Sequence, residues 1–267
     1  MARPEHLPDF DSPPLDEVVL GVQFSPIGGY SSVFARDVWD LFKEQFPGVQ
    51  EQPPLEPSFE TFGGSAPRPG MELRFGPPPL RGRLWFLSKD QNHLIQFQED
   101  RLLLNWRKRP NGQGYPRFEG IAASFEQYLN KLQGFFEAAF GTRLDINQSE
   151  VSYINVVPVE SYSEAGKWFR VLDLESINSE TVSLLCNEVV HDLSGKPYAR
   201  LIHELHSVVT VDRRVKALRF ALSFRGKPAG NDIRAAIAFV RQGREKIVTR
   251  FSDLTTDEAH VNWNRKK

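Results

Sequence analysis

The chain has 267 residues, of which 40% are hydrophobic and 12% aromatic, so one large or two small domains can bury a substantial core and global disorder is excluded. Its 33 basic and 34 acidic residues leave a formal net charge of −1, which argues against a protein that coats nucleic acid through bulk charge. The single cysteine, Cys186, excludes an internal disulfide and a cysteine-based zinc cluster.

The chain carries no sign of a membrane segment. No apolar run reaches the roughly 20 residues of a membrane span. The N-terminal sequence MARPEHLPDFDSPP lacks the apolar core of a signal peptide, and residues 1–16 are expected to form an extended arm. We therefore expect a cytoplasmic protein without a membrane partner.

The first elements after the arm are a strand, a helix and a long irregular segment. Alternating apolar residues over 18–24 predict a half-buried strand, and apolar residues at helical spacing over 34–46 predict about three turns of helix. Residues 47–82 are rich in proline and glycine, which predicts an irregular crossing with at most a short strand at 72–75. Such a length without regular structure is typical of a functional or mobile segment.

The rest of the first half predicts a meander and a long helix. Three strands over 84–88, 93–98 and 102–107 are separated by short polar turns. Apolar residues over 118–140 recur at helical spacing, with charged residues on the opposite face, so this helix should pack one side on a sheet. Gly141 is the expected stop.

The second half predicts a similar order of elements. Asn231 is expected to cap the helix over 233–251, and Thr255 or Thr256 the last helix. The expected elements are a strand over 150–159, helical segments over about 164–170 and 179–193, strands over 198–211 and 215–224, and helices over 233–251 and 256–262.

Two strands that open with Glu-Val, over 17–27 and 150–159, suggest that one unit is used twice. We expect an α+β fold in which an antiparallel sheet is covered on one face by long helices. Two similar β-α-β-β-α lobes, 14–143 and 144–264, would share this sheet. The largest difference between them is the proline-rich crossing 47–82.

Both ends of the chain carry short motifs. These are residues 13–18 (PPLDEV) with 22–24 (VQF), and residues 251–260 (FSDLTTDEAH) with Trp263. Together they resemble a sporadically distributed bacterial and archaeal family of about this length, known by an N-terminal P-P-L-x-E-V strand and a C-terminal F-x-x-[IL]-T helix with a following tryptophan. The resemblance implies a prokaryotic origin and a unit that spans the chain; it implies no catalytic residue.

The densest polar cluster is 200–206 (RLIHELH). A metalloprotease helix needs two histidines four residues apart, whereas His203 and His206 are three apart within a sequence that favours a strand. Arg200 and His206 have the Arg-x5-His spacing of some helical ribonucleases, but they too lie in a predicted strand and not in a helix. We expect a strand whose core face carries Leu201, His203, Leu205 and Val209 and whose solvent face carries Arg200, Glu204 and His206.

Other candidates for catalysis have simpler structural interpretations. His191 with Asp192 could act as a general base, but a histidine in the last turn of a helix also complements the helix dipole. Cys186 is expected to be a small buried residue. No acidic residue is followed two places later by lysine, and no phosphate-binding glycine motif occurs. We expect no catalytic residue, no cofactor and no metal site.

Basic residues cluster near the ends of the predicted hairpins. If the two lobes are equivalent, these clusters would form one basic rim, with Trp106 and Tyr115 as stacking partners for bases. The alternative is that they are ordinary solvated charges that protect edge strands. The residues predicted to contact nucleic acid are Arg101, Arg107, Lys108, Arg109, Arg213, Arg214 and Lys216.

The sequence therefore predicts a non-enzymatic binding or accessory protein of a prokaryotic cell. A protein partner, encoded in a mobile-element or defence-type locus, is the first expectation. Nucleic-acid binding through the basic rim is the alternative, and a hydrolase or metal enzyme around His191, His203 and His206 is the third hypothesis.

Overall fold

The computed structural model contains one nine-stranded sheet in which all neighbouring strands are antiparallel. The order across the sheet is β2-β3-β4-β5-β1-β6-β9-β8-β7. This confirms the predicted antiparallel sheet. The described residues are 4–57, 59–63, 82–110, 112, 114–210 and 214–266.

The strands follow the predicted hydrophobic periodicity in most places. Only β2 and β7 lie where no strand was expected. The strands are β1 (Leu15–Phe24), β2 (Gly48–Gln52), β3 (Arg83–Leu87), β4 (His93–Gln98), β5 (Arg101–Arg107), β6 (Ile146–Pro158), β7 (Ser183–His191), β8 (Pro197–Val209) and β9 (Lys216–Gly226).

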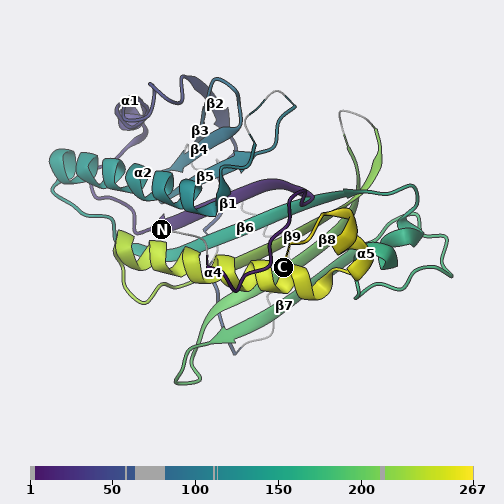
Figure 1. The fold of residues 1–267 in the computed structure, drawn as a ribbon. Helices are drawn as coiled ribbons and strands as arrows, with labels where there is room; N and C mark the ends of the chain where they lie inside the picture. The colour runs from purple at the N-terminus through teal and green to yellow at the C-terminus, as the bar shows by residue number, and fades with distance from the viewer. Residues whose placement is uncertain are drawn as a thin grey trace, which may run out of the picture.

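Two long helices lie across one face of the sheet (Figure 1). Helix α2 packs on β5, helix α4 packs on β6 and β9, and the two helices touch each other. The helices are α1 (Ala35–Asp40), α2 (Arg117–Phe140), α3 (Ala165–Trp168), α4 (Ile233–Leu254) and α5 (Asp257–Asn262), with 3-10 turns at η1 (Ser32–Phe34) and η2 (Tyr162–Glu164).

The helix ends follow from local chemistry. Gly141 ends α2 with a φ of 64°, a left-handed conformation that glycine adopts without steric cost. The side chain of Asp232 accepts a hydrogen bond from the Ala235 amide at 2.7 Å, so Asp232, and not the expected Asn231, caps α4. Thr256 caps α5, as one of the two predicted alternatives.

The strand β7 corrects the predicted helix over 179–193. Val182, Leu185 and Val189 lie at helical spacing, whereas Val182, Leu184 and Val190 lie at strand spacing. Pairing with β8 decides for the strand. Because β7 is an edge strand, Cys186 is exposed, not buried, and His191 ends a strand, not a helix.

Two further helical predictions were too long. The expected helix over 34–46 is shorter, with α1 ending at Asp40 and turns following. The segment expected over 164–170 contains only η2 and α3. The short strand expected at 72–75 lies outside the described residues.

The core lies between the sheet and the helices and continues across the whole sheet. Alternate residues of β1, such as Val18, Leu20 and Val22, are buried on the helix side. On the opposite face, which we call the open face, a small apolar cluster marks the centre. Its members are Val19, Leu103, Ile154 and Ala221.

The N-terminal arm packs against the C-terminal end of the chain. The ring of Phe10 lies 5.7 Å from that of Phe251 and 6.3 Å from that of Trp263. Backbone hydrogen bonds join Asp11 and Ser12 to the segment after α5. The arm that precedes β1 therefore lies against the C-terminal end of the chain.

Candidate functional site

The described part of the proline-rich crossing lies over the open face of the sheet. The Leu55 amide donates to Oε1 of Gln98 at 2.8 Å, and Nε2 of Gln98 donates to the Leu55 carbonyl at 3.0 Å. Further along, the Glu60 amide donates to Oε1 of Gln148 at 3.2 Å. Two glutamines, on β4 and on β6, therefore bind the backbone of an extended segment that crosses the open face from one half of the sheet to the other.

The carboxylate of Glu60 anchors this segment. It accepts hydrogen bonds from Nε of Arg200 at 2.6 Å and from Nε of Arg225 at 2.7 Å. Arg200 also donates to the Thr61 carbonyl at 2.8 Å, and its guanidinium lies 5.5 Å from the centre of the Phe62 ring. Charge-assisted hydrogen bonds of this length are among the strongest in proteins.

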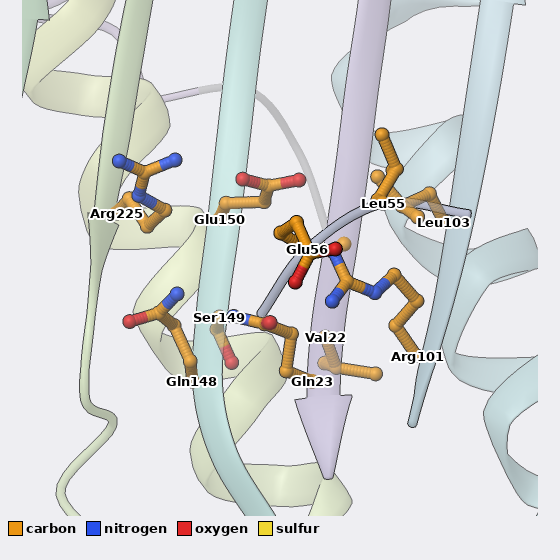
Figure 2. A pocket seen from close by; sticks show the side chains of 11 residues that line it. Val22, Gln23, Leu55, Glu56, Arg101, Leu103, Gln148, Ser149, Glu150 and Arg225 are labelled. Atoms are coloured by element: carbon orange, nitrogen blue, oxygen red, sulfur yellow. The ribbon is translucent and has the colours of Figure 1, made fainter. Parts of the chain in front are cut away.

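A cavity of about 240 Å³ lies between this segment and the sheet (Figure 2). Figure 2 shows Glu150 and Arg225 on one side of the cavity, and Arg101 on the other side pointing toward Glu56 of the crossing. Gln23 and Gln148 line the same space. The lining therefore carries both charge signs, together with the apolar side chains of Val22, Leu55 and Leu103.

Glu150 lies at the floor of this cavity because its neighbour on β1 has no side chain. A Cβ atom at Gly21 would lie 2.9 Å from both Cγ and Oε1 of Glu150. Burial raises the pKa of the Glu150 carboxyl above its ordinary value, and the charges of Arg225 and Arg101 partly oppose this rise.

The two Glu-Val motifs hold equivalent places in the sheet. Glu17 on β1 pairs with Arg107 on β5, and Glu150 on β6 pairs with Arg225 on β9. The neighbouring strand β5 has the sequence RLLLNWR, with arginines at 101 and 107. Strand β9 contains RFALSFR, with arginines at 219 and 225. Each glutamate is thus near two arginines.

These two clusters differ in what they bind. Nε of Arg225 donates to Glu60 of the crossing. The equivalent Nε of Arg107 is buried and has no hydrogen-bond acceptor among the described residues. Glu17 instead accepts a hydrogen bond from Asn105 at 2.7 Å, and burial raises its pKa. Only the cluster at Glu150 holds a carboxylate from the described part of the crossing.

The basic residues predicted from sequence divide between the two ends of the sheet. Arg107, the last residue of β5, and Lys216, the first of β9, lie at the end where β1 begins, and Lys108 and Arg109 follow Arg107 directly. Arg214, just before β9, lies at this end as well. Arg101 lies at the opposite end, buried and paired with Asp100 at 3.0 Å. Arg213 lies outside the described residues.

The predicted stacking partners are wrong. Trp106 is 2% exposed because it lies on the helix side of β5. The ring of Tyr115 packs against it with the centroids 5.0 Å apart, and the Tyr115 hydroxyl lies 3.0 Å from that of Tyr153. Neither ring of this pair can therefore stack on a base without unpacking the core.

The histidine and cysteine candidates form no metal site. His203 is buried and His206 faces the opposite side of β8, where its Nδ1 lies 3.0 Å from the Ser183 hydroxyl. Within the part of the chain that the structure describes, no group of three or more histidine, cysteine, aspartate or glutamate residues could hold a metal ion. Val209, expected in the core, is exposed at the end of the β8–β9 hairpin.

Sequence reasoning missed the role of Glu60 in the crossing and the four residues that bind the crossing, Gln98, Gln148, Arg200 and Arg225. A sequence signal for Arg225 was present, because the Arg-x5-Arg spacing of Arg101 and Arg107 in β5 recurs at Arg219 and Arg225 in β9. The glutamines gave no local signal, since their role depends on pairing between distant strands.

Comparison with known proteins adds no assignment. No protein-family model matches the chain, and no curated protein matches it significantly. Among the described residues, none of the helices combines the length and the apolar character that crossing a membrane requires.

Proposed function

We propose that this chain is a non-enzymatic accessory protein that binds an extended acidic segment of a protein partner on the open face of its sheet. The observation that carries the proposal is the difference between two equivalent arginines. Arg225 binds the carboxylate of Glu60, whereas Nε of Arg107 meets no acceptor among the described residues. A buried guanidinium nitrogen without an acceptor costs free energy that a ligand carboxylate would recover.

The chemistry of the partner follows from the segment that the chain already holds. The described part of the crossing is extended, and it contributes three backbone groups to glutamines and one carboxylate to two arginines. A partner segment at Arg107 would likewise be extended and would carry a carboxylate. Arg219, which is near Glu17, adds a second positive charge at this cluster.

The proposal includes two equivalent lobes, 14–143 and 144–264, that arose by duplication. Its support is the shared strand order away from the centre, β1-β5-β4-β3 on one side and β6-β9-β8-β7 on the other, together with the Arg-x5-Arg stretches of β5 and β9. The prokaryotic origin and the mobile or defence-type locus remain predictions.

The experiment uses the chain's own crossing as the probe. A fluorescent peptide with the sequence of residues 53–63 (PPLEPSFETFG) is titrated with the full protein, and binding is followed by fluorescence anisotropy. We expect binding that weakens about tenfold in Arg107→Gln, because one charge-assisted hydrogen bond contributes roughly 1.5–3 kcal/mol. A peptide with glutamine in place of its second glutamate should bind the wild-type protein about as weakly as the original peptide binds Arg107→Gln.

The matched control is Arg109→Gln, which removes an exposed charge at the same end of the sheet. It should leave the peptide affinity within about twofold of wild type, because exposed charges contribute little. Equal losses in both variants would show nonspecific attraction, and binding that is unchanged in Arg107→Gln, or absent in wild type, would contradict the proposal.

Nucleic-acid binding is a second proposal, supported by five of the basic residues that lie at one end of the sheet. They are Arg107, Lys108, Arg109, Arg214 and Lys216. Retention of labelled RNA or DNA should then fall steeply with salt, and the double variant Lys108→Glu/Arg214→Glu should abolish it. Retention that does not depend on salt, or none at all, would contradict this proposal.

A further inference from the structure

A second cavity lies on the other side of the sheet, between the long helices and the N-terminal arm. Its volume is about 310 Å³. The wall from the arm includes Phe10 and Pro13, and the wall from α4 includes Ile247 and Phe251. The cavity is lined mainly by apolar and aromatic side chains with a few polar groups, which is typical of a small-molecule site.

Four charged residues line the cavity, Asp9, Arg117, Glu119 and Arg244, and of these only Arg244 is buried. Arg244 is 5% exposed and lines the cavity from α4. The buried positions of α2 and α4 follow the same spacing, and Arg244 occupies the place that Leu129 holds in α2. A buried charge costs several kcal/mol where leucine would be stable, so stability alone does not explain this arginine.

The described surroundings satisfy Arg244 only in part. Its Nη2 lies 3.5 Å from Oε1 of Glu119, longer than the 2.7–2.9 Å of a strong charge-assisted hydrogen bond. Its guanidinium carbon lies 5.4 Å from the centre of the Phe118 ring. Its Nε is buried and has no hydrogen-bond acceptor among the described residues. The guanidinium also donates a hydrogen bond to the Tyr153 hydroxyl. Its remaining capacity for an acceptor is therefore at Nε.

The other polar groups place a ligand head group beside Arg244. Tyr153 lines the cavity from β6, and its hydroxyl lies 3.0 Å from that of Tyr115. Asn155, also on β6, is 4% exposed and lines the same space. Hydroxyl and amide groups together with aromatic rings fit a molecule that has one polar head and an apolar body.

We propose that this cavity binds a small amphipathic anion, with its acidic head on Arg244 and its apolar body among Phe10, Phe118 and Phe251. A monocarboxylate meets both requirements, since its oxygens accept from a guanidinium and its chain fills the apolar part. This site is independent of the open face, because it lies on the helix side of the sheet.

The probes are anilinonaphthalene sulfonate, whose fluorescence rises in apolar sites, and decanoate and decanol as competitors. We expect decanoate to displace the dye from the wild-type protein at concentrations about tenfold lower than decanol, because only decanoate adds a charge-assisted contact. Equal potency of the two competitors, or no dye binding, would overturn the proposal. This comparison requires no variant.

Two substitutions then locate the site. Arg244→Leu, which reproduces the residue found in α2, should lower the decanoate affinity about tenfold and change the decanol affinity little. The control Arg234→Leu, at an exposed position of the same helix, should change neither. Val248→Trp, which fills the cavity, should weaken all three probes while the thermal transition remains cooperative. Decanoate affinity that survives Arg244→Leu would overturn the assignment.

Discussion

Glu150 and Glu17 show how the same residue type acquires different surroundings at equivalent positions. Both carboxyls have a raised pKa because of burial. Glu17 is held by a hydrogen bond from Asn105, whereas Glu150 lies in a cavity opposite Gly21 with arginines on either side. Glu150 is therefore the better residue for testing whether burial in this cavity affects stability.

The stability contributed by Glu150 should depend on pH. Its folded-state pKa is raised from 4.5, so the folded protein binds this proton more tightly than the unfolded chain. The resulting stability is present below the ordinary carboxyl pKa and is lost as the pH rises through the raised value. Glu150→Gln cannot ionise, so relative to wild type it should gain urea resistance as the pH rises above the ordinary carboxyl pKa of 4.5.

The measurement is the urea midpoint of both proteins at several pH values. Glu126→Gln, at an exposed position of α2, is the control and should follow wild type at every pH. A difference in urea midpoint between Glu150→Gln and wild type that stays constant over the pH series would show that burial does not govern the pKa of this carboxyl.

At the scale of elements, α4 packs so closely on the sheet that one of its positions requires glycine. A Cβ atom at Gly243 would lie 2.5 Å from Cδ1 of Phe224 and 2.6 Å from Cγ1 of Val151. In α2, Gly134 has no heavy atom within 4 Å of the equivalent added Cβ. These two glycines therefore provide a matched pair of substitutions.

Alanine should have opposite effects at these two positions. Gly134→Ala should stabilise the protein by about 0.5–1 kcal/mol, because alanine loses less backbone entropy in a helix. Gly243→Ala should destabilise it by about 1–3 kcal/mol, because overpacking exceeds that gain. Urea unfolding of both variants measures the difference, and a stabilising Gly243→Ala would contradict the packing of α4.

Local patterns predicted the elements whose partners are near in sequence. The meander β3-β4-β5, the helix α2 with its stop at Gly141 and the cap at Thr256 all depend on local spacing. The strand β7 could not be recognised in the same way, because its apolar residues also fit a helix and only its pairing with β8 selects the strand.

The candidate site was less predictable than the fold. Glu60, Gln98 and Gln148 come from three distant segments, and only the order of the strands brings them together. Arg101 and Arg107 were recognised as a basic cluster, but strand direction places them at opposite ends of β5, with Arg101 buried. A charge cluster in sequence therefore did not become a single surface.

For the whole molecule, the contact between β1 and β6 decides whether the two halves are independent. These strands pair from Leu15 to Phe24, and the hydrophobic core continues across them. Separation would expose two long apolar edge strands and half of the core at once. The chain should therefore unfold in one cooperative step although it has two proposed lobes.

Fluorotryptophan labelling tests this directly, because the chain has five tryptophans distributed over both halves. Trp39, Trp85 and Trp106 report on the first half, and Trp168 and Trp263 on the second. In a urea titration followed by fluorine NMR, all five native resonances should disappear with the same midpoint. Two midpoints that group by half would show that the pairing of β1 with β6 does not couple the lobes, and that each lobe is stabilised by its own part of the core.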